Sequence, residues 1–487
     1  MALAAFWLAP AAPDFPLDDA WIHLDYAQGL IRDGTFAYNQ GRPEAGFTSP
    51  LWVLAETPVL LACNALSASP VLPAKALSLA LGLFGALALA RLVVTLGGGP
   101  IARWFSLLLL WSSPWWVFAS ISGMEVTLFS TLLLLALDRS MHNPGWGAGA
   151  LWALALLARP EAVLPGSVVV GWTLLQKPRG RALFMALPPL VVALAWGAWW
   201  RRVSGHPLPN TFAVKAFSGG GIWQSLGHVG KVLLPAEGVW RVLLVAVLTA
   251  FGLRRADPKR RTALVLGVAL SIGVVLATHP LSPSVRFYHA RYLLPFLAPC
   301  LALGAMGAEA LAERFKRGWV FGLVSGVGLL ALSWPALLDQ RESYQGHCLE
   351  VQEVHTLPAF FVADHLPKGG TVATEAAGSL RYHLPPDRDV LDLLGLNDHF
   401  IAWNSRDQDA RSCYILGSLP QLILVPDGWQ QALAPAFRQE VLSTFESFTW
   451  TAGDGTYLRR VLLIQATPRT GAWDYCRRRF GGTSVTH

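Results

Sequence analysis

Long apolar runs, separated by short polar loops, occupy the first two thirds of the chain. A membrane-spanning helix needs about twenty mostly apolar residues, and somewhat fewer where the helix is short, so we predict about eleven spans. They are Leu3–Ala12, Pro73–Leu96, Ile101–Phe118, Val126–Leu137, Trp146–Ala158, Ala162–Leu175, Leu183–Trp200, Val239–Leu253, Thr262–Thr278, Tyr292–Ala308 and Trp319–Leu337. The first run is too short to span a membrane alone.

After Asp339 the pattern changes to short elements typical of a soluble α/β domain. We predict one helix and four strands, at Val354–His365 and at Thr371–Thr374, Val390–Leu393, Leu422–Val425 and Tyr457–Gln465. The predicted fold class is therefore an α-helical multi-pass membrane protein with a C-terminal soluble α/β domain. Its membrane domain covers residues 1–338, with a first outer loop at 13–72, and its soluble domain covers residues 339–487.

The loops between the predicted spans alternate in charge. One set is densely basic and holds Arg103, Arg139, Lys177, Arg179, Arg181, Arg254, Arg255, Lys259, Arg260, Arg261, Arg314, Lys316 and Arg317. The positive-inside rule puts this set in the cytoplasm, so the first loop and the soluble domain face the outside. Counting the short apolar stretch Leu51–Ala65 as a span would reverse the alternation, so we predict an interfacial helix there.

Composition agrees with a membrane protein, because 53% of the residues are hydrophobic and only 14% are charged. The net charge of +7 does not indicate nucleic-acid binding, since the basic residues form no stripe with aromatic side chains. Cys63 and Cys300 lie in apolar stretches. Among Cys348, Cys413 and Cys476 we expect one disulfide if the tail faces an oxidising space, but the sequence does not choose the pair.

Acidic residues gather in the predicted outer segments. Asp18 and Asp19 precede a short amphipathic helix at Trp21–Ile31, and Glu44 lies in the turn-rich stretch GRPEAGFTSP. Paired carboxylates at a membrane surface can act as a general base that deprotonates an attacking hydroxyl. The alternative is helix capping, which is the commoner use of such residues and applies to Glu125, at the start of a predicted span, as well.

Cations lie on the same predicted side: Arg159 in LARPEA, Lys215 in PNTFAVKA, and Arg286, His289 and Arg291 in VRFYHARYLLP. Such side chains can hold a phosphate and neutralise it as it leaves. Snorkelling at helix ends is the alternative for Arg291, and an ion pair with Glu161 is the alternative for Arg159.

Metal and nucleotide signals are weak. Asp387-Arg388-Asp389 and Asp407-Gln408-Asp409 match the D-x-D metal pattern, but each is a three-residue match in a polar turn. The histidines show no metal-binding spacing, and we predict no metal ligands.

Taken in order, several segments resemble bacterial membrane glycosyltransferases of the GT-C superfamily, and most of all the group that contains the terminal arabinofuranosyltransferases of mycobacterial cell walls. They are LDDAWIHLDYAQGLIRDGTFAYNQGRPEAGFTSPLW, SGMEVTLFSTLLLLAL, ARPEA, LPNTFAVKA, HARYLLPFLAP and DRDVLDLLGLNDHFIA. The opening block is the most distinctive of them.

The resemblance implies an enzyme of the bacterial cell membrane that moves a sugar, with inversion, from a polyprenyl-phosphate donor to a cell-envelope glycan or lipid acceptor on the outer face. The family's catalytic carboxylate corresponds to Asp18 or Asp19, with Asp18 preferred by position. Glu44 corresponds to an acceptor- or sugar-binding glutamate, and we group Glu125 with it. The donor phosphate would meet Lys215 and Arg291, with Arg159 and His289. No obligatory cofactor is expected, although some relatives bind a divalent ion.

Two other classes compete with this hypothesis: a polysaccharide or lipid transporter, and a non-catalytic membrane scaffold. A transporter should show repeated halves with broken helices at equivalent positions, and neither is evident. The soluble domain is either a stabilising cap over the outer loops or a grip on a glycan acceptor, with Trp403, Trp429 and Trp450 as candidate stacking platforms.

Overall fold

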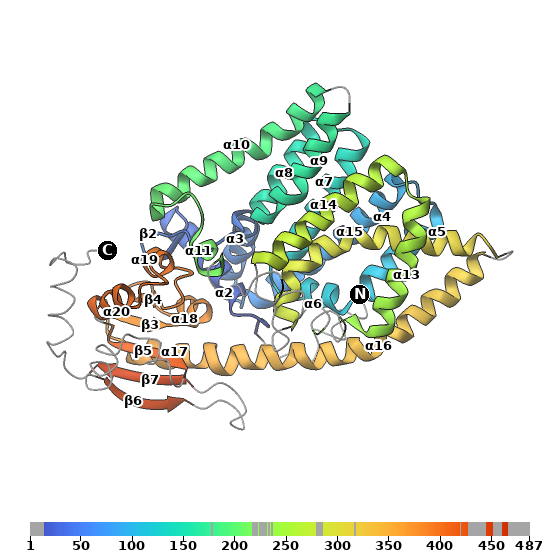
Figure 1. Ribbon diagram of the computed structural model, residues 1–487. Helices are drawn as coiled ribbons and strands as arrows, with labels where there is room; N and C mark the ends of the chain where they lie inside the picture. Colours follow the sequence, from blue (N-terminus) through green and yellow to red (C-terminus); the bar gives the residue numbers. More distant parts are fainter. Residues whose placement is uncertain are drawn as a thin grey trace.

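The computed structural model describes residues 14–176, 179–216, 237–278, 286–315, 318–418, 420–426, 445–450 and 460–465, with single positions at 223, 231 and 234. The predicted span Leu3–Ala12 lies outside them. A bundle of helices forms one part of the molecule, and a mixed sheet with short helices forms the other (Figure 1).

Helices make up the whole of the bundle. Their bounds are α2 Asp19–Asp33, α3 Pro50–Ala65, α4 Val71–Thr95, α5 Pro100–Trp111, α6 Pro114–Ser120, α7 Val126–His142, α8 Trp146–Ala158, α9 Val163–Leu175, α10 Arg179–Ser204, α11 Asn210–Ala216, α13 Val239–Arg255, α14 Pro258–Thr278, α15 Arg286–Ala312 and α16 Gly318–Glu350. Among the described residues, five helices are long and apolar enough to cross a membrane, and shorter apolar helices accompany them. The total of eleven spans stays a prediction.

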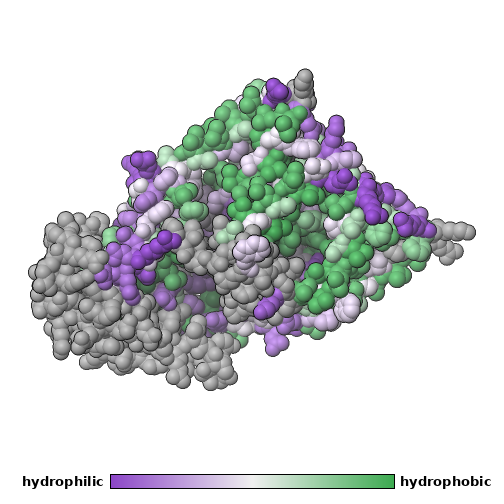
Figure 2. Space-filling view, in the orientation of Figure 1, coloured by the Kyte–Doolittle hydropathy of each residue, from purple (hydrophilic) through white to green (hydrophobic). Residues whose placement is uncertain are grey.

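Apolar side chains cover the outside of the bundle. On α10, Leu183, Leu190 and Leu194 are all more than half exposed. Figure 2 shows a broad hydrophobic band across the helices, with hydrophilic side chains along the far edge and again towards the sheet. This distribution suits a protein whose helices are surrounded by lipid.

One predicted helix is broken in two. The sequence pattern predicts a continuous span at Ile101–Phe118, but the structure ends α5 at Trp111 and begins α6 at Pro114. Proline disfavours a helical conformation in the residue before it, and Ser113 is accordingly extended, with φ −81° and ψ 117°. The Ser113 hydroxyl then accepts a hydrogen bond from the Trp116 backbone N–H at 3.3 Å, which caps α6.

The second part of the chain contains a five-stranded sheet in the order β4-β3-β5-β7-β6. Its elements are α17 Leu357–His365, β3 Thr371–Thr374, α18 Ala377–His383, β4 Asp389–Asp392, α19 His399–Trp403, α20 Gln408–Gly417, β5 Leu422–Pro426, β6 Phe445–Trp450 and β7 Arg460–Gln465. Strand β3 pairs in parallel with β4 and β5, and β7 pairs antiparallel with β5 and β6. The four predicted strands are present, and β6 was missed.

A single long helix joins the two parts. Helix α16 continues past residue 339 and passes through a π-helical segment, Val351–Thr356, into α17. The predicted boundary at 338/339 lies inside α16, and the division into two domains stays a prediction. Figure 1 shows α16 running along one side of the bundle to the sheet.

Among the described cysteines, three have free thiols and one forms a disulfide bond. Cys63, Cys300 and Cys348 are free, whereas Cys413 in α20 is in a disulfide bond. Cys348 therefore leaves the set of predicted disulfide candidates, and Cys476 lies outside the described residues.

The segment predicted as the first outer loop, described from residue 14 to 72, shares one hydrophobic core with the sheet. Tyr26 and Phe47 from the loop pack in the same cluster as Val372 and Leu380. The contact is very close at Gly46, where a Cβ would lie 2.3 to 2.6 Å from polar atoms of Asn397, Tyr26 and Leu396, so no side chain fits there. The Tyr26 hydroxyl also donates a 3.0 Å hydrogen bond to the Asn397 side-chain oxygen. The sheet thus covers the first loop and fixes its conformation.

Asp25 is a buried acid at this contact. Neither carboxylate oxygen has a hydrogen-bond partner among the described residues. Burial raises the pKa of Asp25 well above its usual value; the charge of Arg381 opposes this effect and that of Asp18 adds to it. The folded protein therefore binds this proton more tightly than the unfolded chain does, so Asp25 should reduce stability as pH rises from acid through its raised pKa.

We expect Asp25→Asn to remove this pH dependence and to raise the thermal unfolding midpoint at neutral pH. Thermal unfolding in detergent across a pH series would measure it. Asp364→Asn is the control, because Asp364, in α17, is an exposed aspartate. If Asp25→Asn and Asp364→Asn gave the same pH profile as the wild type, burial of Asp25 would have no energetic consequence.

Candidate active site

A small polar pocket lies where the predicted first loop meets the longer helices of the bundle. Its volume is about 40 Å³, and its walls come from α2, the segment after the short strand β2 (Arg42–Pro43), the start of α7, the α8–α9 connection, α11, α15 and the β4–α19 connection. The lining residues that carry charge or can carry it are Asp19, His23, Glu125, Arg159 and Arg291. The pocket therefore brings together acids and bases that are far apart in sequence, and Asp19 and Arg291 are separated by 272 positions.

Asp19 and Asp18 have different environments although they are adjacent. Asp19 begins α2, lines the pocket and forms a 2.7 Å ion pair with Arg291. The Asp18 carboxylate accepts hydrogen bonds from the backbone N–H groups of Gly378 and Ser379, at 2.9 and 2.8 Å. Asp18 thereby caps the start of α18 in the other part of the molecule and not its own helix, whose N–H groups it does not bond.

Gly378 makes the Asp18 contact possible. A Cβ at this position would lie 2.2 Å from the Asp18 backbone oxygen, closer than any side chain allows. The adjacent carboxylates thus face two different partners, because one is drawn to free N–H groups and the other to a guanidinium.

Arg159 forms a buried cluster with two glutamates. Its Nη1 donates to Glu125 Oε1 at 2.6 Å, while Nη2 and Nε donate to the two Glu161 oxygens at 2.7 and 3.2 Å. Arg159 is extended because Pro160 follows it, which turns the guanidinium away from the end of α8. The predicted alternative of an Arg159–Glu161 ion pair is present, and Glu125 joins it in place of capping α7.

Tyr292 connects the two arginines of the pocket. The guanidinium carbons of Arg159 and Arg291 lie 5.1 and 5.0 Å from the centre of its ring. Arg291 also donates from Nη2 to the Tyr292 hydroxyl at 3.0 Å. Cation–π contacts of this kind help to hold two positive charges close together.

His23 was missed in the sequence analysis. It lies four residues after Asp19 on α2, so helical spacing places both side chains on one face, and that spacing was the available signal. His23 Nε2 is 3.9 Å from Glu125 Oε2. Burial lowers the pKa of His23, and the nearby Glu125 charge opposes this shift. The neutral imidazole can accept a proton as well as donate one.

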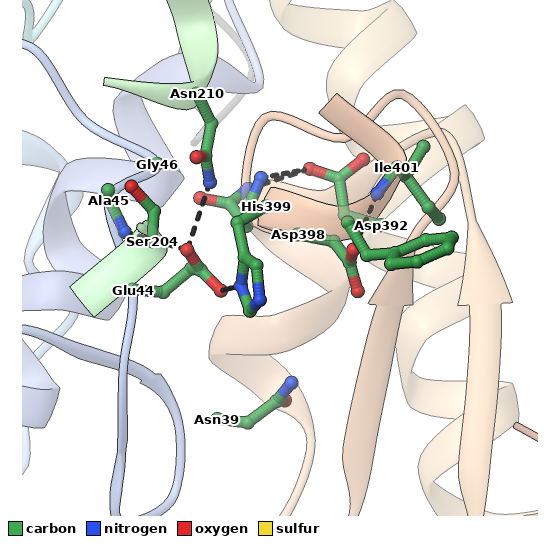
Figure 3. A network of polar contacts seen from close by, with 12 residues as sticks. Asn39, Glu44, Ala45, Gly46, Ser204, Asn210, Asp392, Asp398, His399 and Ile401 are labelled. Atoms are coloured by element: carbon green, nitrogen blue, oxygen red, sulfur yellow. Dashed lines mark hydrogen bonds and ion pairs between the residues drawn. The ribbon is translucent and has the colours of Figure 1, made fainter. Parts of the chain in front are cut away.

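Glu44 belongs to a second polar cluster, shown in Figure 3. Its Oε1 accepts hydrogen bonds from Asn210 Nδ2 and from the Ala45 backbone N–H, both at 2.9 Å. Its Oε2 lies 3.0 Å from His399 Nδ1, at the start of α19. The three side chains come from the first loop, α11 and the sheet part, so Glu44 ties all three together.

Two groups beside Glu44 have pKa values above their usual ones. Its hydrogen bond to Glu44 raises the pKa of His399, while burial raises the pKa of Asp398 to about 6. Half of the His399 side chain remains exposed, so an added molecule can reach it. Trp403 at the end of α19 stacks on His206, with ring centres 3.8 Å apart.

For two of the predicted cations, the structure gives the position of the backbone in a helix but not the position of the side chain. Lys215 lies in α11, four residues after the pocket residue Thr211, and His289 lies in α15, two residues before Arg291. The side chains of Lys215 and His289 are outside the described part of the structure, as are those of Trp429 and Trp450.

An apolar groove opens beside the polar pocket. Its volume is about 290 Å³, and it shares Thr48, Arg159, Thr211 and Tyr292 with the pocket. Beyond these its walls are mainly apolar: Pro160, Val163, Leu164, Trp200, Leu208, Pro209, Phe212 and Val274. The polar pocket and the apolar groove therefore lie on either side of a shared wall.

The described side chains do not suit a metal ion. Among them no group of three His, Cys, Asp or Glu residues lies close enough together to hold one. In the pocket, Asp19 and Glu125 each pair with a guanidinium. Of the D-x-D matches, Asp389 pairs with Arg42 at 2.7 Å, and Asp407 caps α20.

Comparison with known proteins identifies the fold. Residues 341–461 match a family described as a domain of unknown function (DUF8728). A comparison with curated protein sequences gives no match. The ArnT structure from Cupriavidus metallidurans bound to undecaprenyl phosphate matches with a TM-score of 0.58 and 15% identity, over 96% of this chain and 97% of ArnT.

Two further structures have the same fold. The arabinofuranosyltransferase AftD from Mycobacteria matches with a TM-score of 0.52 and 18% identity, over 96% of this chain and 39% of AftD. The Archaeoglobus fulgidus oligosaccharyltransferase in complex with Zn and sulfate matches with a TM-score of 0.52 and 11% identity, over 90% of this chain and 68% of that one. All three are GT-C glycosyltransferases, so the GT-C fold predicted from the sequence resemblance is confirmed.

Proposed function

We propose that this protein is an inverting glycosyltransferase that moves a sugar from a polyprenyl-phosphate donor to an acceptor hydroxyl at the outer face of the membrane. The observation that carries the proposal is the adjacency of two cavities: the polar pocket that holds the Asp19–Arg291 pair shares four lining residues with the apolar groove. A lipid-linked sugar has the matching layout, with a reactive phosphate between a polar sugar and a long apolar chain.

The donor would lie across the pocket and the groove. The groove walls Leu164, Leu208 and Phe212 can shield part of the polyprenyl chain from water. Arg291 can bind the phosphate and stabilise the charge that develops on it. We assign Arg159 to positioning, because all three of its hydrogen bonds in the structure go to Glu125 and Glu161.

Asp19 is the proposed general base. The guanidinium of Arg291 favours the ionised form of a carboxylate 2.7 Å away, which is the form that accepts a proton. The acceptor oxygen would attack the anomeric carbon, its proton would pass to Asp19, and the bond from that carbon to the phosphate oxygen would break. The electron pair leaves with the polyprenyl phosphate. Because attack and departure occur on opposite faces, the anomeric configuration inverts.

A sugar needs more room than the pocket has here. A volume of about 40 Å³ holds roughly one water molecule. We therefore propose that the pocket widens when the donor binds, and that Arg291 moves from Asp19 towards the phosphate. Since the acids of the pocket pair with guanidinium groups, we also propose that transfer needs no obligatory metal ion.

The acceptor side is proposed to lie at the Glu44 cluster. Glu44, Asn210 and His399 present hydrogen-bonding groups of the kind that bind sugar hydroxyls, and His399 is half exposed. The outer location is supported by the charge alternation of the loops and by the disulfide at Cys413, which fits an oxidising space.

Reconstitution in vesicles tests the donor class. We expect transfer from a polyprenyl-phosphate sugar to a glycan acceptor in the presence of a chelator, and none from a nucleotide sugar. Failure with a set of polyprenyl-phosphate pentoses and hexoses, together with net movement of the lipid across the bilayer, would favour the transporter hypothesis.

Phe212→Ser tests the groove. Phe212 is 48% exposed and lines the groove, whereas Phe184 is 49% exposed on α10 and stacks on Trp146 instead. We expect Phe212→Ser to raise the KM for a long-chain donor roughly tenfold, by loss of apolar contact area, with kcat little changed. A short-chain donor should show a much smaller difference, and Phe184→Ser should match the wild type. Equal effects of the two variants would place the lipid chain elsewhere.

A further inference from the structure

A second cavity lies at the opposite end of the bundle from the candidate active site. Its volume is about 330 Å³, and it is lined by the end of α7, the end of α9 and the starts of α10 and α14. Helix α10 runs from this cavity, at Arg179, to Ser204 near the first loop, a distance of roughly 40 Å at 1.5 Å per residue. Figure 1 shows the start of α10 on the side of the bundle far from the sheet.

Positive charge lines the rim of this cavity. Arg181, Lys259 and Arg260 contribute their side chains, and Asp257 is the single acid among the lining residues. The Asp257 carboxylate accepts a hydrogen bond from the Arg260 backbone N–H at 2.9 Å, so it caps the first turn of α14. Arg181 and Lys259 form no ion pair with any other described residue, and both are exposed.

The wall below the rim is less polar. Met141, Val169 and Trp172 line it together with Ser140 and Thr173. Tryptophan is favoured at the membrane–water interface, where its ring contacts acyl chains and its N–H contacts water. The cavity therefore combines cations that can bind an anion with side chains that suit the glycerol and upper acyl region of a lipid.

We propose that this cavity binds the phosphate-bearing headgroup of an anionic phospholipid. Basic pockets between membrane helices bind such headgroups because each Lys or Arg near the surface adds to the attraction. Arg181 on α10 and Lys259 on α14 would then both contact one phosphodiester, which would join the ends of two helices that otherwise belong to separate hairpins. The apolar wall favours a lipid over free phosphate.

Lipid retention measures this binding. The protein is reconstituted in nanodiscs of phosphatidylcholine with a fraction of phosphatidylglycerol, and the lipids retained after transfer to detergent are counted by native mass spectrometry. We expect the wild type to retain phosphatidylglycerol in preference to phosphatidylcholine, and the pair Arg181→Gln with Lys259→Gln to bind it at least tenfold more weakly.

A matched control variant distinguishes binding in this cavity from attraction of the lipid to surface charge in general. Arg103→Gln with Arg254→Gln removes two exposed arginines from the same predicted side but outside the cavity. This pair should retain phosphatidylglycerol like the wild type, and all variants should keep the wild-type thermal midpoint. If the double variant at Arg181 and Lys259 were poorly folded, the single change Arg181→Gln should still weaken phosphatidylglycerol binding. The expected decrease is about half of that in the double variant on a logarithmic scale.

Three outcomes would overturn the proposal. If both double variants lost phosphatidylglycerol equally, the lipid would be attracted by overall surface charge and not by this cavity. Equal retention of phosphatidylcholine would show that the phosphate charge is not recognised. Competition by inorganic phosphate at the same concentration as a soluble short-chain phosphatidylglycerol would identify a site for free phosphate instead of lipid.

Discussion

Sugar transfer by the Asp19→Asn variant is expected to fall by about 10²–10⁴-fold, the usual contribution of a positioned general base. Asparagine keeps the size of the side chain and can still face Arg291, but it cannot take the proton of the acceptor hydroxyl. The measurement is the rate of transfer from a polyprenyl-phosphate sugar by purified protein under saturating donor. Because donor binding does not need the proton transfer, the donor KM should change much less than kcat.

Asp18→Asn is the matched control, since it makes the same chemical change one residue earlier. Asp18 accepts two backbone hydrogen bonds from α18 and does not line the pocket, so the change should leave transfer within a few-fold of the wild type. It should instead lower the thermal midpoint, because the amide removes the charge and replaces one of the two accepting oxygens with an NH₂ group, which would face a backbone N–H donor. Loss of transfer in Asp18→Asn with full activity in Asp19→Asn would reverse the assignment.

Removing Arg159 should have the second-largest effect, and it should act first on folding. Arg159→Met would leave the carboxylates of Glu125 and Glu161 without their cation in a buried place, which typically costs about 3–5 kcal/mol. We expect a large loss of folded protein in detergent, measured by size-exclusion chromatography and thermal unfolding.

A compensated variant distinguishes positioning from folding. Arg159→Met combined with Glu125→Gln and Glu161→Gln removes both uncompensated charges, and we expect it to recover most of the folded protein. Sugar transfer should remain low in the triple variant, because the Arg159 guanidinium that packs on the Tyr292 ring in the pocket wall is lost. Full transfer by the triple variant would make the cluster a purely structural element.

The sequence predicted the secondary structure well where the local pattern was strong. Helix α8 has the predicted bounds Trp146–Ala158, and β3 has the predicted bounds Thr371–Thr374. It failed at Ser113, where apolar character continues through a proline that ends one helix and starts the next. It also missed β6, which lies outside the strongly alternating stretches.

The candidate site residues divide in the same way. Asp19, Arg159, Arg291 and Glu125 were all predicted as site residues, from charges gathered on one predicted side and from the family resemblance, and the structure brings them into one pocket. The sequence does not show which of the neighbouring residues Asp18 and Asp19 faces that pocket. The choice depends on the N–H groups of Gly378 and Ser379, about 360 residues further along the chain.

The sequence by itself determined the membrane character, the order of most helices and strands, and the set of charged residues available for chemistry. These properties depend on local hydrophobicity and spacing, because burial in lipid and helical periodicity act over a few residues. Only the tertiary structure decided the roles of those residues. Ion pairing and desolvation depend on distance in space, so the pairing of Asp19 with Arg291, the enclosure of Arg159 between two glutamates and the adjacency of a polar pocket and an apolar groove arise only when distant helices pack together.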